Sequence, residues 1–240
     1  MDKDLEFLNE CTNDQLRNIA DLLVYNEKGQ KRNDETLSSR KSYSTYYPNE
    51  IKKIVPDIVD ELQRYGGNKI LNALRGHGIQ YRNILEDICD QYKIKYNEFN
   101  TIEEVEGFLL RKLLITSVDN MTMDDIQSVS TEIKSKEALK DLLSTGKLSS
   151  PLILKMTTMM VYGILQKMGV MMANAIVGRF MFGRVFAFLA GPIGWVLGGA
   201  WMAYDLLGHS YKVTVPCVIT IAYYRIINQR TEIEIENSLK

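Results

Sequence analysis

The sequence is poor in cysteine and histidine, and their spacing argues against two common kinds of site. Cys11, Cys89 and Cys217 are odd in number, far apart and part of no CxxC motif, so they predict neither a disulfide framework nor a zinc site. His77 and His209 have no neighbouring Cys or second His, although a metal centre needs three or four ligands. We therefore expect no metal, no cofactor and a reducing, cytoplasmic compartment.

Motifs of enzymes are also missing. The sequence contains no Gly-x-Ser-x-Gly, P-loop or dinucleotide fingerprint, and Gly76-His77-Gly78 follows a helical pattern instead of a strand. No nucleophile, base or metal site stands out, so we expect a non-enzymatic protein. The first residues, Met1-Asp2-Lys3-Asp4, open directly into a polar helix without the apolar run of a signal peptide, which favours a cytoplasm-facing protein.

Charge is almost balanced over the 240 residues but is unevenly distributed. The net charge of −1 divides into −5 for residues 1–150 and +4 for residues 151–240. The polar stretch 26–49 interleaves basic residues with tyrosines, a pattern that can bind single-stranded nucleic acid. Glu27, Asp34 and Glu35 dilute that charge, so a solvated loop is the favoured interpretation and no nucleic-acid partner is expected.

Apolar residues recur at helical spacing through most of the chain, and strand alternation is scarce. Thr12 and Gln15 have the spacing of a capping box, and Pro56 should kink a helix over about 50–65 or mark its start. Further helices are expected at 69–75, 79–93, 101–118, 122–134 and 135–144, and after Lys212 with Pro216 near the first turn. The predicted fold class is an all-α, multi-helix bundle.

The last third of the chain has a different character from the rest. Residues 156–207 are dominated by Met, Val, Ala, Gly, Phe and Leu, and Val185 to Ala203 is a run of 19 residues without charge. That length is near the minimum for crossing a hydrocarbon core of about 30 Å. Because Pro192 directly follows Gly191, two helical arms are more consistent with the run than one rod. The sequence thus predicts a C-terminal glycine-rich hydrophobic hairpin.

Small and aromatic residues in this hairpin indicate what it contacts. Ala190, Gly194 and Gly198 recur at every fourth position if one helix passes through Pro192, and Gly194 and Gly198 do so in either case. Small residues at this spacing let two helix backbones approach closely. Trp195 and Trp201 suit a lipid headgroup boundary. We accordingly predict an acidic amphipathic-helix domain over 1–150, a cationic apolar hairpin region over 151–230 that can pack with it as one unit, and a polar, frayed tail over 231–240.

Two ways of covering the hairpin remain open. Between residues 151 and 227 six basic residues face one acid, Asp205, and each surface cation attracts anionic lipid by about 1 kcal/mol. Arg179 and Arg184 would each cost about 2.5–3.5 kcal/mol at a bilayer centre, which favours a short hairpin dipping into a membrane from one side. The alternative is a soluble assembly factor or chaperone-like binder of a protein client, with the hairpin as its core. Self-association through the small residues fits both.

One further cluster suggests an anion site. Arg75, His77 and Arg82 surround a glycine break that opens a helix, where backbone N–H groups can hold an anion. The plainer interpretation is that the glycines turn the chain between packed helices. Convergence of Arg75 and Arg82 on one concavity would favour the site, whereas pairing with nearby acids would count against it.

Several motifs, in the same order over nearly the whole chain, resemble those of the bacterial YaaW family. They are Asp4-Leu5-Glu6-Phe7-Leu8, Glu27-Lys28-Gly29-Gln30-Lys31-Arg32, Glu61-Leu62-Gln63-Arg64-Tyr65-Gly66-Gly67-Asn68, Leu74-Arg75-Gly76-His77-Gly78 with Tyr81, Gly191-Pro192-Ile193-Gly194-Trp195 and Tyr211-Lys212-Val213-Thr214-Val215-Pro216. This uncharacterised family brings no catalytic residues with it. The middle of the chain is weakly similar to the helical chaperone of ubiquinol–cytochrome c reductase assembly, which implies an all-helical, assembly-related module.

Overall fold

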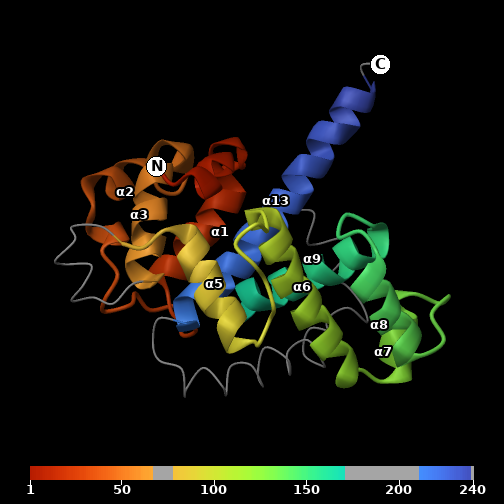
Figure 1. The fold of residues 1–240 in the computed structure, drawn as a ribbon. Coiled ribbons are helices and arrows are strands. Elements are labelled where there is room, and N and C mark those ends of the chain that lie inside the picture. The colour runs from red at the N-terminus through yellow and green to blue at the C-terminus, as the bar shows by residue number, and fades with distance from the viewer. Residues whose placement is uncertain (67–77, 171–210, 239–240) are drawn as a thin grey trace.

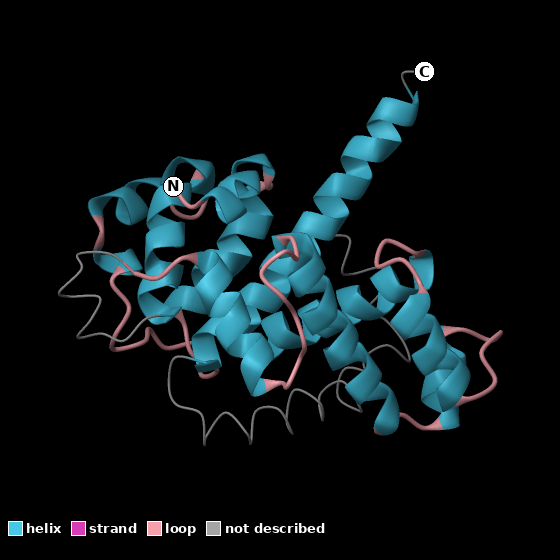
Figure 2. Ribbon diagram, viewed as in Figure 1, coloured by secondary structure: helices cyan, strands magenta, loops and turns pink. Residues whose placement is uncertain are grey.

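The computed structural model describes residues 1–66, 78–170 and 211–238, and over these ranges the chain is helical (Figures 1 and 2). Among the described residues the β-structure is limited to an isolated antiparallel bridge between Tyr25 and Lys31. The α-helices, with three 3-10 helices marked η, are η1 Lys3–Glu10, α1 Asn13–Val24, η2 Leu37–Ser39, α2 Lys41–Tyr46, η3 Ile51–Ile54, α3 Val55–Gly66, α5 Tyr81–Gln91, α6 Ile102–Asp119, α7 Met123–Val129, α8 Lys136–Thr145, α9 Pro151–Lys167 and α13 Tyr211–Ser238. The predicted all-α class is confirmed.

Local sequence signals explain where several helices begin. The Thr12 side chain accepts from the Gln15 backbone N–H, and the Gln15 side chain accepts in return, which confirms the capping box of α1. Thr101 and Glu104 cap α6 in the same way. Pro56 is the second residue of α3, a position where no intrahelical donor is lost, so it marks a new start as predicted.

Helix α13 is the central element of the described fold. It packs against α1, α3, α5, α6 and α9, and Figure 1 shows it passing through the middle of the molecule before its C-terminal end projects outwards. From Val213 to Arg225 nearly every side chain is buried, including Thr214 and Thr220. One apolar cluster therefore joins helices from both sides of residue 150.

The structure corrects three expectations. The stretch 26–49 is not simply a solvated loop, because it contains η2 and α2, buries Leu37, and ties Arg40 to Asp57 and Asp60. Pro216 lies inside α13 and not in its first turn. The tail expected to fray from residue 231 continues as helix to Ser238, since the apolar body already anchors the preceding turns of α13.

Candidate functional site

A buried ion pair joins α6 to α13. The Arg225 Nε donates to Glu106 Oε2 at 2.8 Å, and its Nη2 donates to Oε1 of the same carboxylate at 3.2 Å. The Tyr81 hydroxyl on α5 donates to Glu106 Oε1 at 2.7 Å. Glu106 is 2% exposed and Arg225 6% exposed, so three helices meet at one desolvated, fully bonded cluster.

The N-terminal segment completes this cluster. The carbonyl of Asp4 accepts from Arg225 Nη2 at 2.5 Å, and the guanidinium lies 4.0 Å from the centre of the Phe7 ring. Glu103, which is half-exposed, lies 3.7 Å from Arg225 Nη1. The positive charge of Arg225 is thereby held by two carboxylates, a carbonyl and an aromatic face.

The electrostatics identify the cluster as structural. Burial, the largest single cause, would lower the pKa of Arg225, but Glu106 together with Tyr81 and Glu103 raises it overall. Burial raises the pKa of Glu106, while Arg225 and Tyr81 oppose the shift. A perturbed carboxyl is often a catalytic acid, yet both oxygens of Glu106 are engaged by Arg225 and Tyr81. The carboxylate therefore holds three helices together, and each of its oxygens already accepts a hydrogen bond from within the protein.

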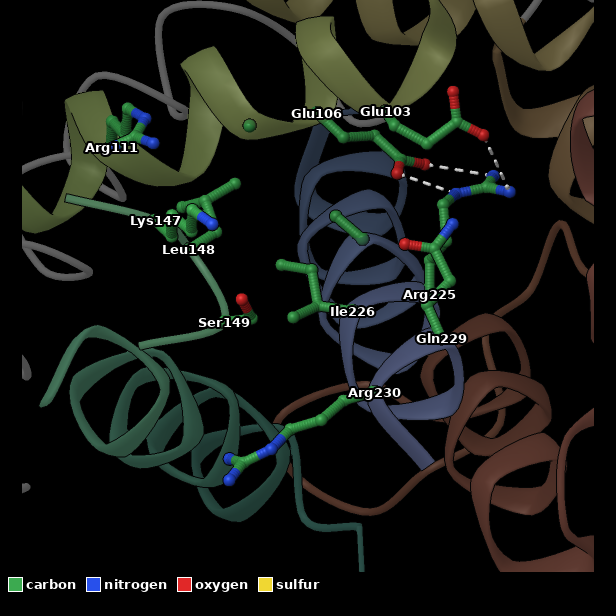
Figure 3. A pocket seen from close by; sticks show the side chains of 12 residues that line it. Glu103, Glu106, Arg111, Lys147, Leu148, Ser149, Arg225, Ile226, Gln229 and Arg230 are labelled. Atoms are coloured by element: carbon green, nitrogen blue, oxygen red, sulfur yellow. Dashed lines mark hydrogen bonds and ion pairs between the residues drawn. The ribbon is translucent and has the colours of Figure 1, made fainter. Parts of the chain in front are cut away.

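A cavity of about 540 Å³ lies beside this pair, between α6, α13 and the connection from α8 to α9 (Figure 3). Its walls are largely apolar and include Gly107, Leu148, Ala222 and Ile226. Gly107 is needed here, because a Cβ built on it would lie 2.9 Å from Leu148 Cδ1. The size lies within the range of small-molecule and peptide side-chain sites.

The polar part of the lining is mostly cationic. Figure 3 shows Arg111 and Lys147 on one side and Arg225 with its acids on the other, with Arg230 below. Arg111 donates to the Leu143 carbonyl at 2.6 Å, and Lys147 is exposed. Because Glu106 neutralises Arg225, the remaining charged residues of the lining are Arg111, Lys147, Arg230 and the acid Glu103. The cavity is suited chemically to a ligand with an apolar body and an acidic group.

The residues predicted for the anion and hairpin sites can be placed only in part. Arg82 donates from Nε to Glu86 at 2.8 Å and from Nη1 to the Asn100 carbonyl at 2.9 Å, so one face of its guanidinium is engaged within the protein. The other members of the two sites lie outside the described residues: Arg75, His77, Ala190, Gly191, Gly194, Trp195, Gly198 and Trp201. Both sites stay predictions.

Sequence reasoning missed the ion pair, although a signal was present. Glu106 follows Val105 and precedes Leu109 by three positions, so it occupies the apolar stripe of α6. Arg225 sits likewise among Ile221, Ala222 and Ile226. Opposite charges at stripe positions of two helices indicate a buried pair, but nothing local says that these two helices are neighbours.

Cysteine and metal chemistry have little support in the described part of the chain. Cys11, Cys89 and Cys217 are free and buried, and burial raises the pKa of their thiols to about 11, 12 and 12. Over residues 1–66, 78–170 and 211–238, no group of three or more His, Cys, Asp or Glu side chains could hold a metal ion. None of the helices in these ranges combines the length and apolar composition of a membrane-crossing helix.

Comparison with known proteins places the chain in a family. Residues 1–33 match a domain of unknown function, DUF3944. A UPF0174 protein of Helicobacter pylori strain J99 is 31% identical over 95% of this chain and 93% of its own length. The UPF0174 protein YaaW of Escherichia coli O157:H7 is 32% identical over 97% of both chains, and that of strain K12 is 31% identical over the same shares. No solved structure matches. The chain therefore belongs to the uncharacterised UPF0174 family that includes YaaW, as its motifs predicted.

Proposed function

We propose that this chain is a non-catalytic helical protein that associates with the cytoplasmic face of a membrane, inserting its glycine-rich apolar segment among anionic lipids. One observation carries the proposal. The amphipathic helices that could cover this segment in water already pack against α13 and against each other.

Few large apolar side chains of the described helices are exposed. The stripes of α1, α3, α5 and α6 are buried in one cluster around α13 and α9. Among the described residues, the large apolar side chains left exposed are Met1, Phe99, Met123 and Leu142, which lie on separate elements. These single residues form no broad apolar patch on the surface.

The composition of residues 171–210 makes such a cover necessary. This stretch has one acid, Asp205, and two arginines, Arg179 and Arg184, among mainly apolar residues. Burying a Val, Leu, Ile, Phe or Met side chain stabilises by about 1.5–3 kcal/mol, so leaving the stretch in water is strongly unfavourable. A lipid phase or a second copy of the segment supplies the missing apolar surroundings.

The structure also shows that two of the six basic residues between 151 and 227 are bound within the protein. Arg225 is buried against Glu106, and Lys155 donates to the Val129 carbonyl at 2.9 Å. These two no longer count among the six basic residues expected to attract anionic lipid. Four remain, Lys167, Arg179, Arg184 and Lys212, and we propose Arg179 and Arg184 as the principal candidates because they belong to the apolar segment itself.

Vesicle sedimentation of the full chain tests the proposal. The protein should pellet with vesicles containing phosphatidylglycerol, pellet less with phosphatidylcholine alone, and resist extraction by carbonate. Arg179→Glu with Arg184→Glu should lower the bound fraction, while Lys95→Glu, an exposed lysine of the α5–α6 loop, should not. Full recovery of the wild-type protein in the supernatant would contradict the proposal.

A second candidate function is supported by the cavity. Apolar walls with Arg111, Lys147 and Arg230 at the edge suit an acidic amphipathic segment of a client protein, as an assembly factor would require. A labelled acidic amphipathic helical peptide should then bind the wild-type protein more tightly than Lys147→Glu, with Lys95→Glu as the charge-matched control. Equal affinities for the three proteins would exclude this use of the cavity.

A further inference from the structure

Arg32 is a buried cation that lacks a counter-charge in the described part of the molecule. The residue is 8% exposed, and its Nε and Nη2 are buried atoms without a hydrogen-bond partner. A guanidinium stays protonated at any physiological pH, so Arg32 cannot escape desolvation by losing its charge. Burying such a charge unpaired costs several kcal/mol, and a folded protein must recover that cost.

The two nitrogens define the chemistry of what Arg32 would bind. In Arg225 the same pair, Nε and Nη2, donates to the two oxygens of the Glu106 carboxylate. This edge of a guanidinium presents two parallel N–H groups that match a carboxylate or phosphate. Arg32 therefore presents to a ligand the same pair of N–H groups, on Nε and Nη2, that Arg225 presents to Glu106; we call this pair the fork.

The backbone around Arg32 holds this fork in place. The Arg32 N–H donates to the Val24 carbonyl at 2.8 Å, directly beyond the bridge of Tyr25 with Lys31. Gly29 makes the intervening turn with a φ of +69°, which favours glycine, and its backbone approaches Gly169 at the end of α9. The turn is thus closed by backbone hydrogen bonds that lead directly into Arg32.

Two groups that interact electrostatically with Arg32, Cys217 and Tyr65, have pKa values raised by burial. Asp34, Glu35 and Glu61 act on Tyr65 without forming an ion pair with the Arg32 guanidinium within 4.0 Å in the described residues. The pKa of the Cys217 thiol is raised to about 12 by burial, with Arg32 opposing the shift. The pKa of the Tyr65 hydroxyl is raised by burial and by Asp34 and Glu61, and again Arg32 opposes. Asp34 accepts from Tyr65 Oη at 3.4 Å instead of from the Arg32 fork.

A second unsatisfied donor lies on the same side of α13. The Thr220 hydroxyl is buried and without a hydrogen-bond partner, and Thr220 follows Cys217 by three positions, about one helical turn. Thr220 thus lies on the face of α13 that also carries Cys217.

We propose that Arg32 binds an oxyanion, a phosphate or carboxylate group, that comes from outside the chain. This site is separate from the predicted Arg75, His77 and Arg82 cluster and does not depend on membrane association. The same chemistry is offered by free phosphate and by the headgroup of an anionic phospholipid. The experiment must therefore distinguish these two sources.

Thermal unfolding of the full chain, with and without inorganic phosphate, tests the site. Without phosphate, Arg32→Met should unfold at the same or a higher temperature than wild type, because the substitution removes a desolvated charge and keeps the aliphatic stem. Phosphate at about one hundred times its dissociation constant should raise the wild-type Tm by about 5 °C or more and leave Arg32→Met unchanged. Sodium chloride at equal ionic strength is the control for general salt effects.

Two further comparisons make the result decisive. In a second series, vesicles containing phosphatidylglycerol replace phosphate. If the Tm of wild type but not of Arg32→Met rises with vesicles alone, the ligand is a lipid headgroup. If it rises with phosphate, the ligand is the free anion. Asp205→Asn tests whether the chain supplies its own counter-ion, because Asp205 is the one acid in the sequence ranges 67–77 and 171–210. The site is disproved if Arg32→Met is strongly destabilised without ligand, if neither probe separates it from wild type, or if the response appears only in Asp205→Asn, because the chain would then supply its own counter-ion.

Discussion

The buried pair of Glu106 and Arg225 predicts unequal effects of two single substitutions. Glu106→Gln leaves a guanidinium that cannot lose its proton at a position only 6% exposed, and this should destabilise the protein by about 3–5 kcal/mol. Arg225→Met leaves a carboxyl group instead. Burial already raises the pKa of Glu106, so the carboxyl can take up a proton, and the loss near pH 5 should be about 1–3 kcal/mol.

The sign of the pH dependence follows from the same shift. A carboxyl whose pKa is raised by folding binds its proton more tightly in the folded state, so its contribution is present below the unfolded pKa and lost as pH rises through the folded value. Without the guanidinium that opposes the shift, the pKa of Glu106 rises further. Arg225→Met should therefore be distinctly less stable at pH 8 than at pH 5.

Urea unfolding at the two pH values, followed by circular dichroism, measures these differences. The double variant Glu106→Leu with Arg225→Met should recover most of the lost stability, because an apolar pair replaces the ionic one. Arg17→Gln breaks a pair with Asp14 near the surface and should cost no more than about 1 kcal/mol. Equal losses for the two single variants at pH 5, or a larger loss for Arg225→Met, would refute the assignment of a buried, charged pair.

Three other predictions test separate parts of the structure. Burial raises the pKa of Asp21 to about 6, so this carboxyl stabilises the folded state below about pH 4 and loses that contribution as pH rises through 6. Asp21→Asn should therefore flatten the fall in Tm between these pH values, and an unchanged Tm profile would contradict this. The thiols of Cys11, Cys89 and Cys217 should be inert to Ellman's reagent in the native protein and react after denaturation, whereas rapid native labelling would show an accessible thiolate. Thr101→Ala removes the cap of α6 and should cost about 1 kcal/mol in urea unfolding, with Thr101→Ser close to wild type; equal stability of both variants would argue against the cap.

Much of the local structure follows from short-range signals. The capping box at Thr12, the proline start at Pro56 and the stripe of the helix over 101–118 depend on residues within a few positions of each other, and the structure confirms all three. The stretch 26–49 was misjudged because its order comes from distant partners. Arg40 forms ion pairs with Asp57 and Asp60 of α3, and no pattern within residues 26–49 predicts these pairs.

The tertiary role of the last helix could not be predicted from its sequence. Apolar residues surround α13 without a clear stripe, which is the pattern of a helix buried on all sides. Its neighbours α1, α3, α5 and α6 all end about ninety or more positions before α13 begins. The pairing of Glu106 with Arg225 and the isolation of Arg32 follow from that packing. Neither can be predicted from the pattern of a single helix.

Fractionation of cells is the most direct test of the proposed function. The intact chain, expressed at its natural level, should sediment with membranes and remain there after a carbonate wash, because the mainly apolar residues 171–210 need apolar surroundings, which we propose a membrane supplies. Recovery of the whole population in the soluble fraction, as a monodisperse species free of lipid, would contradict membrane association and leave the client-binding role in its place.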